Sequence, residues 1–180
     1  MRILIASDTH GRLQAVKKLD RLIQRYQPDK IALLGDFLYN GPRNGVPSDY
    51  DPLACSVIFN KHAAKTIGIR GNCDSRIDES LLHFPLEDSR VVFLNGYRVD
   101  MIHGDLLTGD LLHIERGDIL MYGHSHVYML KKSDGVVFMN PGSTSFPKNG
   151  NPATYGVMEG SHLEIRRLDD DLSVASMDLD

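Results

Sequence analysis

Five short apolar segments of this chain each stop at a polar cluster, and this pattern constrains fold and chemistry more than any other feature of the sequence. The segments are ILIAS, IALL, TIGIR, DMI and ILMY. The clusters that follow them are Asp8-Thr9-His10-Gly11, Gly35-Asp36, Gly71-Asn72-Cys73-Asp74, His103-Gly104 and Gly123-His124-Ser125-His126. Because ligands of open sheets collect beyond the carboxyl ends of strands, we expect the five clusters to converge on one place.

The first half of the sequence alternates strands and helices. Apolar runs at 2–7 and 31–35 predict strands that are covered on both faces, and apolar residues at helical spacing over 13–26 predict an amphipathic helix between them. A second helix is expected to begin at Pro52 and to run to about residue 64, followed by a third buried strand over 66–71. This order predicts βαβ units with right-handed crossovers.

The second half is richer in strands. Asn95-Gly96, a dipeptide favoured in two-residue hairpin turns, separates two apolar runs, and further short strands follow as far as an edge strand at 172–177. The two halves together predict an α/β fold of two sheets packed face to face with helices outside, in a single domain spanning 1–180. The long irregular stretch at 37–52 predicts a functional loop, since loops of this length are uncommon in compact domains.

The composition of the chain excludes some classes of function and partner. The formal charge of −4 argues against a protein that blankets nucleic-acid phosphates, so long nucleic acids are not expected as partners, whereas a small phosphorylated ligand is. No apolar run fits a signal peptide or a membrane span, so we expect no membrane association and a cytoplasmic location. Cys55 and Cys73 form no CxxC pair and indicate neither a disulfide framework nor a zinc finger. The composition is compatible with a homo-oligomer.

The clusters supply seven side chains able to bind metal through oxygen or imidazole nitrogen: Asp8, His10, Asp36, Asn72, His103, His124 and His126. Seven exceeds what one tetrahedral site uses, so two ions fit better. A carboxylate such as Asp36 could bridge ions about 3.5–4 Å apart, the separation at which paired metals clamp the attacking and leaving oxygens of a displacement. In extended backbone, residues two apart point to the same side, so each Asp-x-His or His-x-His pair could face one cavity.

Each cluster alone has a simpler explanation. A single His-x-His or Asp-x-His motif is more often a surface turn or a hydrogen-bonded pair than a metal site. Gly35-Asp36 alone is typical of a turn. The metal site is favoured because all five clusters follow separate apolar segments.

The motifs DTH, GD, GNCD, HG and GHSH, in this order and with NPGS at 140–143, resemble the signature of the calcineurin-like metallophosphoesterases. GPRN at 41–44, RGNCDS at 70–75 and PKNGNPATYG at 147–156 further resemble the YfcE-type phosphodiesterase branch. The resemblance implies a four-layer α/β/β/α sandwich of two mixed sheets. It also implies one metal ion on Asp8, His10, Asp36 and His126 and a second on Asp36, Asn72, His103 and His124.

The ligand types and the resemblance together predict a function. Mixed carboxylate, amide and imidazole ligands suit Mn²⁺, Fe or Zn²⁺, and we favour manganese. A metal-bridging hydroxide is expected to attack phosphorus in small phosphodiesters without a protein base. The alternatives are a non-catalytic scaffold or protein-interaction module, because the same fold serves in the small subunit of the retromer sorting complex, and a nuclease.

One position departs from the family pattern. Many relatives have histidine after GN, placed to protonate the leaving oxygen, whereas this chain has Cys73. Because a thiol is a weaker acid than imidazolium, we expect better activity on diesters that release a stabilised anion. The alternative is that Cys73 is small, inert and partly buried. Asp74 could orient a metal ligand or be exposed, and Arg43 and Asn44 could bind phosphate or merely be solvated.

Overall fold

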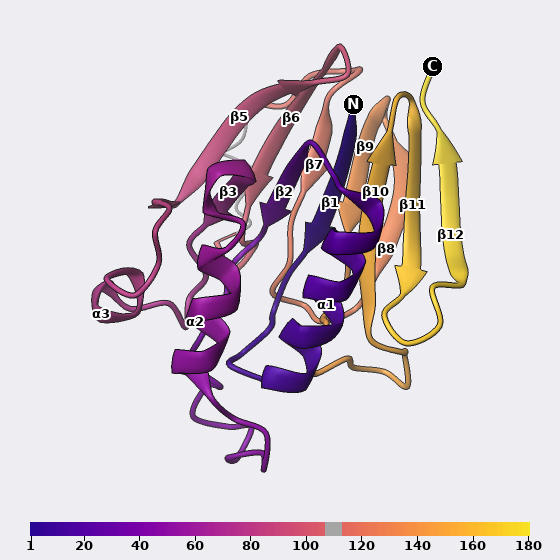
Figure 1. The fold of residues 1–180 in the computed structure, drawn as a ribbon. Helices are drawn as coiled ribbons and strands as arrows, with labels where there is room; N and C mark the ends of the chain where they lie inside the picture. The colour runs from indigo at the N-terminus through magenta and orange to yellow at the C-terminus, as the bar shows by residue number, and fades with distance from the viewer. Residues whose placement is uncertain (107–112) are drawn as a thin grey trace.

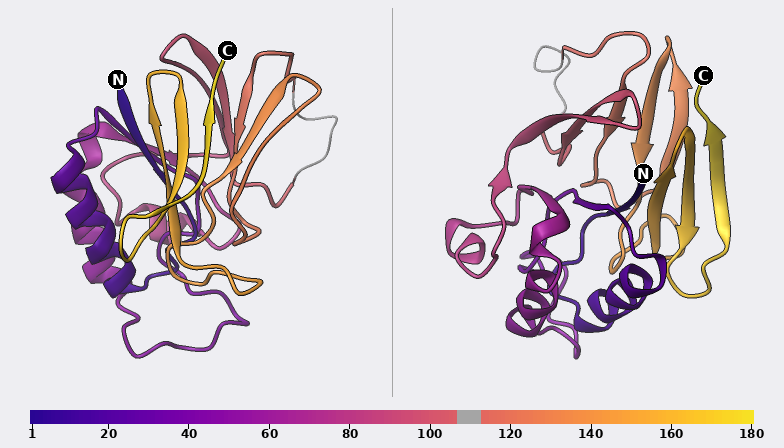
Figure 2. Two further views of the ribbon diagram at one scale, coloured as in Figure 1. Left: turned by 90° about the vertical axis from the view of Figure 1, so that its right-hand side faces the viewer. Right: turned by 45° about the horizontal axis from the view of Figure 1, so that its top comes forward.

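A computed structural model describes residues 1–106 and 113–180. Two β-sheets pack face to face, and helices cover the outer side of one of them (Figure 1). Figure 2 shows the stacked sheets from two further directions, with α1 and α2 together on one side. The predicted α/β architecture of two mixed sheets is confirmed. Within the described residues, the helical layer is the one on the larger sheet.

The larger sheet has seven strands. In spatial order they are β12 (Ser173–Asp178), β11 (His162–Arg167), β10 (Thr154–Glu159), β1 (Arg2–Ala6), β2 (Lys30–Leu33), β3 (Thr66–Ile69) and β4 (Leu86–Glu87). The last four strands run parallel to one another, and the first three pair antiparallel with their neighbours. The predicted edge strand near the C-terminus is therefore present as β12.

The smaller sheet has five strands. In spatial order they are β5 (Ser89–Leu94), β6 (Tyr97–Ile102), β7 (Ile119–Met121), β9 (Val136–Asn140) and β8 (Met129–Ser133). The three central strands are parallel, and both edge strands are antiparallel to their neighbours. The predicted hairpin is confirmed: Asn95 and Gly96 join β5 to β6 with φ of 53° and 93°, the positive values that a type I′ turn requires.

The helical elements are α1 (Leu13–Tyr26), α2 (Pro52–Asn60), the 3₁₀ turn η1 (Ala63–Lys65) and α3 (Arg76–Glu79). The first predicted helix is confirmed, and the second begins at Pro52 but ends earlier than expected, with η1 after it. The short helix α3 was not predicted. It begins with a capping box in which Ser75 and Asp78 bond each other's backbone N–H groups. No described helix has the length and apolar content that a bilayer crossing needs.

Two cores explain why the first strands are apolar without interruption. Along β1, Ile3 and Ile5 pack between the two sheets, whereas Leu4 and Ala6 pack under the helices. Successive side chains of a strand point to opposite faces, so a strand covered on both sides must be apolar at every position. The buried strands thereby hold the loops that follow them in fixed positions.

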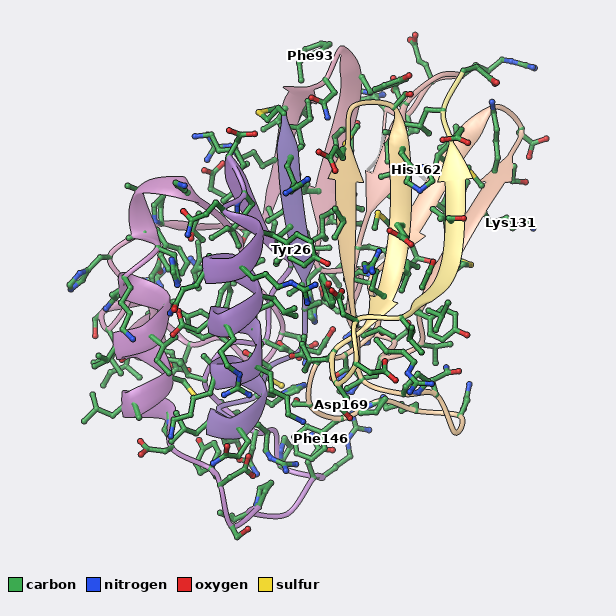
Figure 3. The ribbon with its side chains drawn as sticks, turned by 45° about the vertical axis from the view of Figure 1, so that its right-hand side comes forward. Tyr26, Phe93, Lys131, Phe146, His162 and Asp169 are labelled. Atoms are coloured by element: carbon green, nitrogen blue, oxygen red, sulfur yellow. The ribbon has the colours of Figure 1, made fainter. Side chains whose placement is uncertain are left out.

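Those loops meet at one end of the molecule. Strands β1, β2 and β3 are parallel in one sheet and β6 and β7 are parallel in the other, and each is followed by one of the polar clusters. Figure 3 shows Phe146, whose ring lies 5.6 Å from that of His10, at the opposite end of the sheets from Phe93. The expected convergence of the five clusters is therefore present.

Candidate metal centre

The backbone at the clusters adopts an uncommon conformation. Five of the seven candidate ligands have positive φ: Asp8 56°, His10 47°, Asp36 58°, His124 61° and His126 60°. Left-handed backbone costs a non-glycine residue about 1–2 kcal/mol, so it persists only where the surrounding structure imposes it. The paired residues do face one cavity, but through left-handed turns rather than the extended backbone that we expected. Strain concentrated at one place is typical of a functional site.

Neighbouring loops hold one another in place. The backbone N–H of Asp8 donates to Gly35 O at 3.0 Å, and that of His10 donates to Asp36 O at 2.9 Å. The third loop comes equally close, because a Cβ added at Gly71 would lie 2.2 Å from Asp36 Oδ1. Only glycine allows this approach.

The first half of the centre is buried. Asp8, His10, Asp36 and His126 each offer a ligand atom, and these atoms all lie within 4.8 Å of one another. The Nδ1 atoms of the two histidines lie 2.9 Å from Tyr39 O and 2.7 Å from Phe146 O. A carbonyl oxygen only accepts, so each Nδ1 carries the hydrogen and each Nε2 presents a lone pair.

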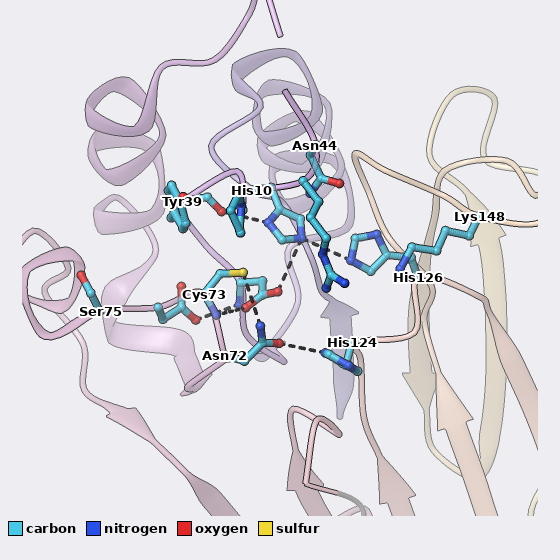
Figure 4. A pocket seen from close by; sticks show the side chains of 14 residues that line it. His10, Tyr39, Asn44, Asn72, Cys73, Ser75, His124, His126 and Lys148 are labelled. Carbon is cyan, nitrogen blue, oxygen red and sulfur yellow. Dashed lines mark hydrogen bonds and ion pairs between the residues drawn. The ribbon is translucent and has the colours of Figure 1, made fainter. Parts of the chain in front are cut away.

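These lone pairs face each other. His10 Nε2 lies 3.2 Å from His126 Nε2 (Figure 4). Close by, Asp8 Oδ1 is buried without a hydrogen-bond partner among the described residues, 3.2 Å from His126 Nε2. Leaving a buried carboxylate oxygen unsatisfied is costly, and facing lone pairs repel each other. A divalent cation removes both problems, so this half fits a metal ion.

The second half comprises Asn72, His103 and His124. His103 donates from Nδ1 to Leu34 O at 2.7 Å, and its Nε2 lies 3.1 Å from Asn72 Oδ1. Asn72 Oδ1 also lies 2.8 Å from His124 Nδ1 (Figure 4). One amide oxygen thus faces two imidazole rings, a donor set that suits a second cation.

Asp36 lies between the halves. Its Oδ1 accepts the backbone N–H of Cys73 at 2.8 Å, which orients the carboxylate. Its Oδ2 is 3.5 Å from His10 Nε2 in the first half and 3.5 Å from His103 Nε2 in the second. This carboxylate is therefore the group that both halves share.

The charges of the metal-free centre are uneven. Burial lowers the pKa of His10 and outweighs the neighbouring carboxylates. Burial also acts against protonation of His103, but its contact with Asp36 prevails and raises its pKa to about 9. Burial opposes the charge on Asp36 as well, yet His103 lowers its pKa to about 2. Without metal, Asp36 and His103 are thus an ion pair.

Asp74 is buried, which excludes the exposed alternative. Its carboxylate accepts the backbone N–H groups of Asp36 at 2.8 Å, Phe37 at 2.7 Å and Gly71 at 2.8 Å. Burial raises its pKa to about 7, against the effect of these bonds. These contacts fix the loop that carries Asp36, so Asp74 acts on the centre through its neighbours.

A pocket of about 780 Å³ opens over the centre and includes Cys73, Arg43 and Asn44 in its lining. Cys73 is half-buried, and burial together with the charge of Asp36 raises the pKa of its thiol to about 12. Asn44 donates to Asn40 O at 2.6 Å and so ties its own loop together. All the residues predicted for the site lie in this region.

Sequence reasoning missed some residues of the site. Tyr39 and Lys148 line the pocket, while Ser143 and Ser145 donate to Asp8 O at 2.8 and 2.7 Å. The length of the 37–52 loop and the motif around Lys148 were visible in the sequence, but neither assigned a contact. Only the folded structure brings these segments to the centre.

Comparison with known proteins gives consistent results. The family model described as the calcineurin-like phosphoesterase superfamily domain matches residues 1–162. Phosphodiesterase YfcE of Escherichia coli K12 is 37% identical over 179 residues, which cover 98% of this chain and 97% of YfcE. A solved structure of YfcE, described as a phosphoesterase from E. coli, matches with a TM-score of 0.95 at 36% identity over 100% of both chains. The predicted metallophosphoesterase fold is thereby confirmed.

A more distant structure shares the fold alone. Vps29 of Entamoeba histolytica, solved in complex with Zn²⁺, matches with a TM-score of 0.64 at 19% identity over 100% of both chains. At this identity the likeness carries no information on activity.

Proposed function

The chain belongs to the calcineurin-like phosphoesterase superfamily, and from this premise we propose that it is a metal-dependent phosphodiesterase acting on small phosphodiesters. One observation carries the proposal: two imidazole Nε2 atoms 3.2 Å apart, whose hydrogens are assigned to Nδ1, face each other beside a buried carboxylate oxygen of Asp8 that has no hydrogen-bond partner among the described residues. A bound cation offsets both the repulsion between the lone pairs and the unsatisfied carboxylate oxygen, which supports a metal site here.

The proposal includes two ions, with Asp36 shared. Asp8, His10 and His126 complete one site, and Asn72, His103 and His124 complete the other. Support for a second ion comes from Asp36 Oδ2, which is equally distant from an imidazole of each half. Manganese is proposed for the mixed donor set. When bound, such ions lower the pKa of water and offset charge on phosphoryl oxygens.

The chain's own groups restrict the substrate. The Cys73 thiol stays protonated at neutral pH, so it supplies no nucleophile, and it is a poor proton donor to a leaving alkoxide. Asp74 keeps Asp36 oriented, and Arg43 is proposed to bind an oxygen of the scissile phosphate through its guanidinium. We therefore propose that the favoured substrates are diesters whose leaving group is a stabilised anion.

The test combines metal analysis with hydrolysis of bis(p-nitrophenyl) phosphate. Protein purified with Mn²⁺ is expected to hold two ions per chain, to lose hydrolysis on chelation and to regain it on return of Mn²⁺. Asp8→Asn is expected to lose the ion of the first half together with the activity, whereas Asp20→Asn, in α1 and paired with His62, should retain both ions and the activity. A metal-replete protein that hydrolyses no diester contradicts the proposal and favours the scaffold alternative.

A further inference from the structure

Two basic side chains line the pocket without an acidic partner. Arg43, between β2 and α2, and Lys148, between β9 and β10, are both exposed, and neither charged group has a hydrogen bond or ion pair among residues 1–106 and 113–180. The pocket's carboxylates are engaged elsewhere, because Asp36 binds the Cys73 N–H and faces two imidazoles, and Asp74 accepts three backbone N–H groups. Both cations are thus available to a ligand.

The neighbouring cavity differs in this respect. It measures about 670 Å³, shares Asn72 and Asp74 with the pocket, and contains three arginines. Each of these arginines has an acidic partner, the pairs being Arg70 with Glu79 and Asp88, Arg90 with Glu87, and Arg98 with Asp100 and Asp118. In a chain with 24 acidic and 20 basic residues, partners are plentiful. Cations left unpaired at the pocket over the metal centre therefore point to an anionic ligand there.

The backbone of Lys148 has a fixed position relative to the centre. Its N–H donates to His126 O at 3.1 Å, and its own carbonyl accepts the N–H of Asn151 at 3.1 Å. The preceding residues Ser143 and Ser145 bond Asp8 O, so the whole segment is attached to both Asp8 and His126. Figure 4 shows Lys148 beside His126, across the site from Tyr39 and Cys73.

The other cation, Arg43, belongs to the loop that lies against Cys73. Asn44 holds the loop of Arg43 closed, and a Cβ added at Gly41 would lie 3.6 Å from Cys73 Sγ, so this loop rests against Cys73. Cys73 occupies the position from which the resemblance expects contact with the leaving group. An ester arm that points away from Cys73 therefore lies toward Lys148 (Figure 4).

We infer that Lys148 forms a second anion subsite, which selects phosphodiesters whose retained ester arm carries an additional phosphate or carboxylate. This inference rests on the proposed function, in which Arg43 and the metal centre bind the scissile phosphate. A second anion on the retained arm forms a charge-assisted hydrogen bond with the ammonium group of Lys148. An uncharged arm leaves this group solvated and gains nothing from it.

A matched pair of substrates tests the inference. Ethyl p-nitrophenyl phosphate and 2-carboxyethyl p-nitrophenyl phosphate share the leaving group and differ only in the retained arm. In wild-type protein with Mn²⁺, kcat/KM is expected to be about tenfold higher for the carboxyethyl diester, the size of one charge-assisted hydrogen bond. Lys148→Met should reduce this ratio to about one. Lys131→Met, at an exposed lysine of β8, should preserve the ratio.

Arg43→Met provides a further distinction, because it should lower kcat/KM for both diesters and leave their ratio unchanged. Equal rates for the two substrates in wild-type protein, or an undiminished ratio in Lys148→Met, overturn the inference while the phosphodiesterase proposal stands.

Binding separates the two proposals when hydrolysis is absent. The phosphinates ethyl(phenyl)phosphinate and (2-carboxyethyl)(phenyl)phosphinate have only P–C bonds to their arms and so cannot be hydrolysed. Calorimetry with the Mn²⁺-loaded protein should show about tenfold tighter binding of the carboxyethyl compound, and Lys148→Met should abolish the difference. This result without hydrolysis of either diester supports the subsite and contradicts the phosphodiesterase function. Equal affinities for the two phosphinates overturn the subsite.

Discussion

The two halves of the candidate metal centre differ in charge and exposure. In the first half, Asp8, His10 and His126 are all buried and include a carboxylate. In the second half, Asn72 is exposed, His124 is partly exposed, and the only oxygen besides that of Asp36 comes from a neutral amide. An anionic ligand in a buried environment attracts a cation more strongly than a neutral ligand near solvent does. We therefore expect the first half to bind its ion more tightly.

Removing the shared carboxylate should have the largest effect. Asp36→Ala takes a ligand from both halves at once, so both ions should be lost, and hydrolysis of an aryl diester should fall by on the order of 10³-fold. Metal content and kcat/KM measure the two outcomes. Retention of one ion at full occupancy contradicts a carboxylate shared by two sites.

Variants that remove a ligand from only one half should distinguish the two halves. Asp8→Ala removes the charged ligand of the first half and is expected to weaken one Mn²⁺ site by about 100-fold or more, whereas His124→Ala should weaken the other site by about tenfold. Calorimetric titration with Mn²⁺ gives the two affinities. Loss of both ions in either variant would show that the halves do not bind independently.

Substituting Asp74, which holds the loop of the shared Asp36, should have a smaller effect, and one that is similar for the two halves. Asp74→Asn places an amide N–H₂ against backbone N–H donors of Asp36, Phe37 or Gly71. We expect the free energy of unfolding to fall by about 1–3 kcal/mol and Mn²⁺ affinity to fall roughly tenfold in both halves. Urea unfolding and calorimetry measure these changes, with exposed Asp88→Asn as control. An unchanged metal affinity would limit Asp74 to a role in stability.

The smallest expected difference between the two halves lies in the pH dependence of their metal affinity. In the metal-free protein the pKa of His103 is raised to about 9, whereas that of His10 is lowered below its usual 6.5. Only neutral imidazole binds metal, so at pH 7 the second-half ion displaces a proton from His103, and the first-half ion displaces none from His10. Below pH 9 the affinity of the second half should therefore fall by up to about tenfold per pH unit.

Calorimetry in buffers of different ionisation enthalpy counts the released protons. At pH 7 the weaker ion is expected to release more protons than the tighter ion. The opposite assignment, or no release at all, contradicts the unequal charges described for the two halves.

Features with local causes were visible in the sequence. The hairpin at Asn95-Gly96 follows from turn chemistry, and α1 follows from apolar spacing over Leu13–Tyr26. The convergence of the five clusters followed from the rule that ligands collect at the carboxyl ends of strands. The helix α3 was missed because one turn of helix has no measurable periodicity, although its capping box could have indicated it.

Features with distant causes were not visible. The left-handed backbone at Asp8 and His126 depends on the packing of loops from different strands, and nothing in the local sequence requires it. Asp74 was left open between an orienting role and exposure, because its three N–H donors belong to a loop and a turn that meet only after β2 and β3 pair. The free cation at Lys148 likewise depends on which carboxylates fold close to it.

The sequence by itself determined the kind of side chain at each strand end, and therefore that oxygen and imidazole ligands gather at one edge of two sheets. Only the tertiary structure decided which nitrogen of each histidine faces the centre. His10, His103 and His126 direct Nδ1 to backbone carbonyls 29, 69 and 20 residues away in the sequence. A tautomer is set by the hydrogen bond of the other ring nitrogen, and those partners reach the rings only after the chain has folded.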